Sequence, residues 1–181
     1  MKERLYEILM ADDVVLSIDN KMDELLTIVP EIKATIGFEH NHPYHHLDVW
    51  QHTLYALSFA PKDFDIRLSL LFHDLAKPLV CTTDNDGVRH FRGHPDKSCE
   101  IAYFELKRLG FDDMFINKIC YLVKYHDTPI TIEDIENDLE LQKTRYIIQY
   151  CDGLAHNPDI LFKKEQYLDK TLVLLNNHRT K

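Results

Sequence analysis

Apolar residues recur every three or four positions along most of the chain, a period typical of amphipathic helices. Capping residues and helix breakers mark several ends, such as Asp63 and Asp112 as N-caps and Gly110 as a C-terminal stop. Pro95 suits the first position of a helix. The pattern predicts helices over residues 2–11, 20–29, 31–37, 48–59, 63–77, 95–109, 112–126 and 138–155, a helical turn over 131–136, and a last helix ending near 177.

Two segments interrupt this period. Residues 80–91 contain two short runs of β-forming residues around Asp86-Gly87, which predicts a small β-hairpin. Residues 39–46 are polar and hold four of the eleven histidines, which predicts a loop. No repeat, low-complexity tract or linker is visible, so we expect one all-α domain over residues 1–181, a bundle of about eight helices with one hairpin.

Composition narrows the class of protein. Hydrophobic residues make up 45% of the chain, enough for a core, and the net charge of -9 argues against broad binding to nucleic acid. The four cysteines form no CxxC pair, and we expect them to be reduced and structural. Neither a signal peptide nor a membrane-spanning run is present, so we expect a soluble cytoplasmic protein that does not associate with membranes.

A His-Asp pair lies inside an apolar helical run, residues 66–79. Burying the Asp74 carboxylate there costs several kcal/mol unless it is paired or bound to a metal. Lys77 follows Asp74 by three residues, so a buried salt bridge between them is one solution. A metal ion with Lys77 beside it is the other.

Four more residues favour a metal, because each is placed where a helix would present it: His52, His94, His126 and Asp152. Asp48 precedes His52 by one helical turn and is predicted to orient its imidazole. His94 precedes Pro95 at a predicted helix N-terminus, where an anion is also favoured. Histidine and carboxylate donors without a thiolate suit Mn, Fe, Co, Ni or Zn, with Mg as a further candidate.

In this order, His52, His73-Asp74 and Asp152 resemble the H…HD…D signature of HD-domain metal-dependent phosphohydrolases. With His94 and His126 added, the set of six residues resembles the branch with two metal ions. The segment from about 25 to 158 is more closely similar to the HD domain attached to bacterial tRNA nucleotidyltransferases, through residues 29–31, 48–54, 73–78, 86–94 and 152–158. Because only about 25 residues precede it here, we expect a free-standing relative without the nucleotidyltransferase domain.

The resemblance implies an HD-domain bundle with one or two metal ions, Asp74 bridging if there are two. A metal-activated water would hydrolyse a phosphate ester of a small nucleotide or related molecule. The expected metal ligands are His52, His73, Asp74, His94, His126 and Asp152, and the expected catalytic residues are Asp74 and Lys77. The expected substrate-binding residues are Lys77, Arg92, His94, Ser98, His46 and Arg145. We expect His40, His42, His45 and His90 at the surface or pocket rim, and His156 and His178 in solvent.

Three alternatives stay open at this stage. His94 and His126 are either ligands or a pocket wall that contacts substrate. The same six residues also resemble the di-iron centre of HD-type oxygenases. A non-catalytic module that binds a nucleotide is the third alternative.

Overall fold

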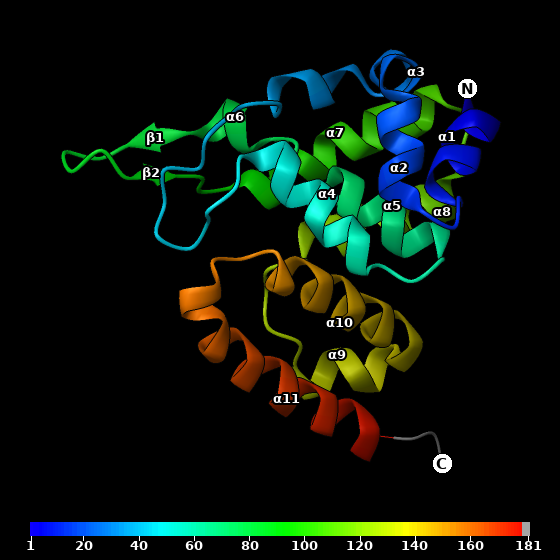
Figure 1. The fold of residues 1–181 in the computed structure, drawn as a ribbon. Coiled ribbons are helices and arrows are strands. Elements are labelled where there is room, and N and C mark those ends of the chain that lie inside the picture. Colours follow the sequence, from blue (N-terminus) through cyan, green and yellow to red (C-terminus); the bar gives the residue numbers. More distant parts are fainter. Residues whose placement is uncertain (179–181) are drawn as a thin grey trace.

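The computed structural model describes residues 1–178, with residues 160 and 163 described by their backbone alone. It is a helical bundle with one small antiparallel hairpin, which confirms the predicted all-α class (Figure 1). The elements in chain order are α1 (Lys2–Leu9), α2 (Val14–Asn20), α3 (Met22–Ile28), η1 (Pro30–Ala34), α4 (Val49–Phe59), α5 (Phe64–Phe72), α6 (Lys77–Val80), β1 (Thr82–Thr83), β2 (Arg89–His90), α7 (His94–Arg108), α8 (Asp113–Lys124), α9 (Ile132–Asn137), α10 (Leu139–Leu154), η2 (Pro158–Ile160) and α11 (Leu161–Asn177).

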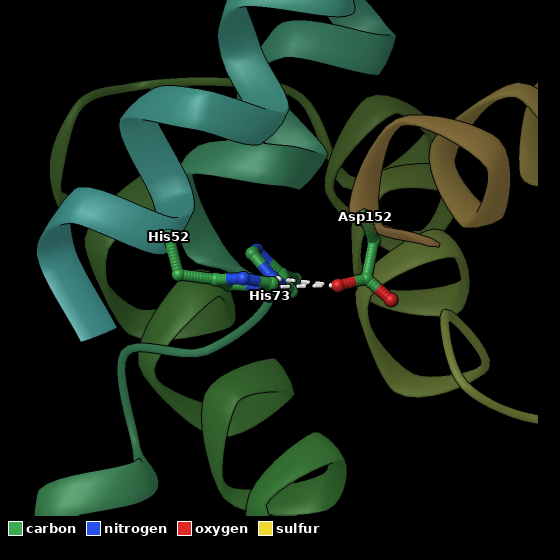
Figure 2. A group of neighbouring side chains, drawn as sticks. All are labelled: His52, His73 and Asp152. Carbon is green, nitrogen blue, oxygen red and sulfur yellow. Dashed lines mark hydrogen bonds and ion pairs between the residues drawn. The ribbon is translucent and has the colours of Figure 1, made fainter. Parts of the chain in front are cut away.

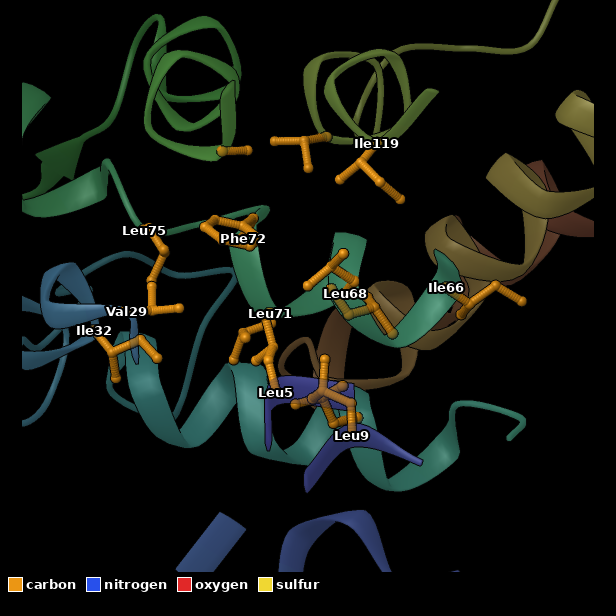
Figure 3. Close-up of a cluster of buried hydrophobic side chains, with 14 of the residues drawn as sticks. Leu5, Leu9, Val29, Ile32, Ile66, Leu68, Leu71, Phe72, Leu75 and Ile119 are labelled. Atoms are coloured by element: carbon orange, nitrogen blue, oxygen red, sulfur yellow. The ribbon is translucent and has the colours of Figure 1, made fainter. Parts of the chain in front are cut away.

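Helix α5 is the centre of the core, in contact with α1, α4, α7, α8 and α10. Its Leu68, Leu71 and Phe72 are fully buried among side chains of the surrounding helices (Figure 3). Each such side chain stabilises the fold by about 1.5–3 kcal/mol through burial alone. The end of α5 is therefore held on all sides, and the residues that follow it occupy fixed positions.

The structure corrects the predicted helix 63–77, which ends at Phe72 rather than at Lys77. Residues 73–76 form tight turns in which the Leu75 N–H donates to Phe72 O and the Lys77 N–H to Asp74 O. Pro78 has no N–H to continue an α-helical ladder, and it lies in the first turn of the short α6 instead. His73 and Asp74 thus lie in a turn at the end of the central helix.

Two other segments near the N-terminus differ from prediction. The sequence pattern missed α2, which Asp13 caps by accepting a hydrogen bond from the Leu16 N–H at 2.9 Å. This helix is short and buries only Val14 and Ile18, too few positions to set up a clear period. The predicted helix 31–37 is a 3₁₀ turn, η1.

The hairpin forms as predicted, with Thr82 opposite His90 and Thr83 opposite Arg89. The Asp84 carboxylate accepts from the N–H groups of Asp86 and Val88, and Gly87 supplies the positive φ of 81° that the turn requires. The Arg89 N–H donates to Asn41 O at 3.1 Å, which ties the hairpin to the polar segment 39–46. In Figure 1 the two segments lie side by side at one end of the molecule.

Among the described residues, no helix has both the length and the apolar character needed to cross a bilayer.

Candidate metal centre

Separate elements bring the six candidate ligands together in two groups of three. His52 from α4, His73 after α5 and Asp152 from α10 form the first group (Figure 2). Asp74 after α5, His94 at the start of α7 and His126 after α8 form the second. Within each group the ligand atoms lie within 4.8 Å of one another, close enough to share one ion.

Asp74 lies between the two groups and directs one oxygen to each. Its Oδ2 lies 3.6 Å from His52 Nε2 and 3.2 Å from His73 Nε2. Its Oδ1 lies 3.2 Å from His94 Nε2 and 3.9 Å from His126 Nε2. A carboxylate in this position is placed to bridge two cations.

All four imidazoles are oriented in the same way, by a backbone carbonyl at Nδ1. The carbonyls are those of Ala155 for His52 (3.1 Å), Leu70 for His73 (2.6 Å), Phe91 for His94 (2.9 Å) and Val123 for His126 (2.7 Å). A carbonyl only accepts, so Nδ1 carries a proton, and Nε2 is the ring atom that each histidine directs into the cluster. Each Nε2 faces a carboxylate of the cluster, the arrangement expected of metal-binding histidines.

Several buried polar atoms at the centre of the cluster lack a hydrogen-bond partner. Among the described residues, His73 Nε2 and both oxygens of Asp74 make no well-aligned hydrogen bond, although Lys77 Nζ lies 2.7 Å from Asp74 Oδ2. Leaving such groups unsatisfied costs about 1–3 kcal/mol each. A cluster of imidazole nitrogens and carboxylate oxygens is chemically suited to divalent cations, which would satisfy these atoms.

Both cluster carboxylates are ionised at neutral pH. Burial would raise the pKa of Asp74, but His73 and Lys77 hold it well below its usual range. Burial would likewise raise the pKa of Asp152, but His156, His52 and Lys164 hold it well below that range. Negative charge is therefore available to a cation.

The cluster opens into a cavity of about 310 Å³. Asp74, Asp152, His94 and His126 line it, together with the cations Lys77, Arg89, Arg92 and Lys164. The rest of the wall consists of His42, Tyr44, His45, His90, Phe91, Asp127 and His156. Four cationic side chains around one opening, in a protein of net charge -9, make this pocket suitable for an anionic ligand.

Lys77 and Arg92 line this pocket, as does His94. Lys77 is tightly held, since its ammonium lies 2.7 Å from Asp74 Oδ2 and donates to His40 Nε2 at 3.0 Å. His40, expected at the surface or pocket rim, is instead buried and accepts this bond while its Nδ1–H donates to Leu47 O.

Three predicted substrate contacts lie outside the pocket. Ser98 is fully buried, and its Oγ accepts from the Ala76 N–H at 3.1 Å, so it anchors the turn that carries His73 and Asp74. Arg145 is buried and donates to the carbonyls of residues 125, 128 and 129. His46 is exposed, and the neighbouring His45 lines the pocket instead.

Asp48 also differs from prediction. Its carboxylate caps α4 by accepting from the Gln51 N–H at 2.8 Å, and the Ala155 carbonyl orients His52 instead. The order Asp-x-x-Gln at a helix start is a capping signal that would have indicated this.

Sequence reasoning missed several pocket residues. His156, expected in solvent, lies in the pocket with its ring centroid 4.8 Å from that of His45. His45, expected at the surface or pocket rim, lines the pocket and stacks on His40 with ring centroids 3.8 Å apart. Tyr44 and Lys164 also line the pocket. The many histidines in residues 39–46 were a sign that this loop contributes to the site. No local sequence pattern indicates that Lys164 does.

Comparison with known proteins identifies the family of the chain. The HD domain family model matches residues 44–163. The CC-adding tRNA nucleotidyltransferase of Thermus thermophilus is 34% identical over 104 residues, which cover 54% of this chain and 24% of that protein. The A-adding tRNA nucleotidyltransferase of Deinococcus radiodurans is 31% identical over 114 residues, 60% of this chain and 26% of that protein. The chain thus spans about a quarter of the length of these relatives.

Proposed function

The chain belongs to the HD domain family, and from this premise we propose that it hydrolyses a phosphate ester of a nucleotide or a related small molecule, using bound metal. The family implies the metal-dependent phosphohydrolase superfamily, and the candidate metal centre supplies the residues for that chemistry. The observation that carries the proposal is the position of Asp74, with one oxygen toward each of two histidine groups.

The donor set favours Mn, Fe, Co, Ni or Zn, in one or two positions, and also accommodates Mg. When bound, such ions lower the pKa of a coordinated water and polarise a phosphoryl oxygen. His52, His73 and Asp152 would hold one ion, and His94 and His126 a second, with Asp74 shared.

The chain's own residues have separate tasks in this proposal. The buried Lys77 keeps Asp74 ionised and in place, because its ammonium lies 2.7 Å from Asp74 Oδ2. Arg92 is exposed at the mouth and is placed to attract the anionic substrate. The positive end of the α7 helix dipole, at His94, would favour negative charge on the phosphoryl oxygens.

The size of the pocket supports a small substrate. About 310 Å³ is at the low end of cavities that enclose small ligands, roughly 300–1,000 Å³. A mononucleotide or the terminal nucleotide of a longer chain fits that range better than an extended polymer. The net charge of -9 also opposes extensive nucleic-acid contact.

The test is metal analysis of protein purified without chelator, beside a panel of phosphomonoesters and phosphodiesters with each candidate metal added. We expect bound metal and turnover in the wild type, and loss of both in Asp74→Asn, which keeps the shape of the side chain and removes its charge. His46→Ala, at an exposed position outside the pocket, is the matched control and should retain both. Full metal content and turnover in Asp74→Asn would refute the proposal.

The panel also separates the alternatives. Oxygen consumption with iron and no ester cleavage would indicate an oxygenase. Nucleotide binding with no product under any metal would indicate a non-catalytic module.

A further inference from the structure

Lys164 differs from the other lysine of the pocket in the freedom of its ammonium group. Within residues 1–178, Lys164 Nζ makes no hydrogen bond, and its carboxylate neighbour, Asp152 Oδ2, lies 3.7 Å away. Its side chain is 26% exposed, so the ammonium is at the pocket wall rather than in bulk solvent. Lys77, by contrast, contacts both Asp74 and His40, and its side chain is 6% exposed.

Gly153 explains how Lys164, on another helix, reaches this wall. A Cβ at residue 153 would lie 3.0 Å from Lys164 Cγ and 3.1 Å from Lys164 Cε, closer than normal carbon contacts. The aliphatic part of Lys164 therefore crosses α10 through the space that a glycine leaves, directly beside Asp152. Even a methyl group at residue 153 would require the Lys164 side chain to shift by a few tenths of an ångström.

From these contacts we infer that Lys164 binds the phosphate of the substrate, and that Gly153 is the residue that positions it. This inference rests on the proposed function for the identity of the ligand as a phosphate ester. An ammonium with three unused donors gains most from a phosphate oxygen, because a charge-assisted hydrogen bond is about twice as strong as a neutral one. The ammonium of Lys77 is already engaged by Asp74 and His40, so Lys164 is the pocket lysine whose ammonium is available to a phosphate.

A purely structural explanation makes a different prediction. If Lys164 only balances the charge of Asp152, its removal should change metal binding and leave phosphate binding alone. The family match ends at residue 163, so the family model does not cover this lysine.

The experiment measures the affinity of the Mn²⁺-loaded protein for inorganic phosphate by calorimetry, and separately its affinity for Mn²⁺. We expect Lys164→Met to weaken phosphate binding about 10-fold or more, the loss of one hydrogen bond from a charged group, with Mn²⁺ affinity within about 3-fold of wild type. Lys164→Arg, which keeps the charge, should restore most of the affinity. Gly153→Ala should weaken phosphate binding in the same direction, and adding it to Lys164→Met should have no further effect.

Two outcomes would overturn the inference. One is unchanged phosphate affinity in Lys164→Met together with weaker Mn²⁺ binding, which would leave only a charge-balancing role. The other is no measurable phosphate binding by the wild-type protein. A third outcome is that phosphate binding depends on Lys164 but the protein cleaves no ester. This would refute the proposed hydrolysis and support the phosphate site.

Discussion

The sequence suggested that Arg145 contacts substrate, whereas its contacts in the structure indicate that it supports the fold. Replacing Arg145 by Met tests which of these roles it has. The side chain is 1% exposed. Its Nε donates to Tyr125 O at 2.8 Å, and its Nη2 donates to Thr128 O at 2.6 Å and to Pro129 O at 3.2 Å. These carbonyls belong to the segment that follows α8 and contains His126.

The expected loss of stability depends on which carbonyl oxygens lose a hydrogen-bond donor. Gln149 Nε2 also donates to Tyr125 O and Thr128 O, so both keep one partner in the variant, whereas Pro129 O loses the Arg145 donor. Hydrogen bonds from a charged group contribute about 1.5–3 kcal/mol each. With this partial replacement we expect a loss of about 3–5 kcal/mol, which lowers Tm by roughly 6–20 °C for a chain of this size.

The assay is urea unfolding followed by circular dichroism, with the KM for any active ester measured in excess Mn²⁺. Lys143→Met is the matched control, because Lys143 lies on the same helix and its ion pair with Glu140 is at the surface. That control should cost less than about 1 kcal/mol. A free energy of unfolding within about 1 kcal/mol of wild type, together with a KM raised about 10-fold, would refute the structural role. It would indicate that Arg145 binds substrate.

Two further predictions concern the turn that carries Asp74 and the buried histidines. Ser98→Ala should cost about 1–3 kcal/mol and weaken metal binding, because the buried Ala76 N–H loses its acceptor; an unchanged urea midpoint and metal content would contradict this. In the metal-free protein, burial lowers the pKa of His40 to about 3 and that of His126 to about 4, from an ordinary value of 6.5. Both groups take up protons on unfolding, so stability should fall as pH drops from about 6.5 toward 4. The raised pKa of His73 acts mainly above pH 6.5, where it makes stability fall as pH rises. A urea midpoint that rises as pH drops over the first range would show that the sign is wrong.

Much of the fold follows from the sequence because its causes are local. The helical period, the caps at Asp63 and Asp112, and the Asp86-Gly87 turn each depend on residues within a few positions of one another, and the structure has the corresponding elements. The order of histidines and aspartates likewise indicated the HD family, which the family match confirms.

Other features depended on contacts between distant segments. The sequence placed Arg145 and Ser98 on helix faces but could not indicate which groups those faces contact. Arg145 contacts backbone carbonyls, and Ser98 contacts the Ala76 N–H. Helix α5 ends at Phe72 because tight turns and Pro78 follow it, although the apolar period continues to Leu79.

The amino-acid sequence by itself indicated most of the helices, the hairpin and the six candidate metal ligands, because periodicity, capping and residue type act locally. Only the tertiary structure decided that Asp74 directs one oxygen toward each histidine group, that His45 rather than His46 enters the pocket, and that Lys164 reaches it across Gly153. The physical reason is that these positions are set by the packing of helices far apart in the chain, and a local pattern contains no information about the surface that a side chain will face.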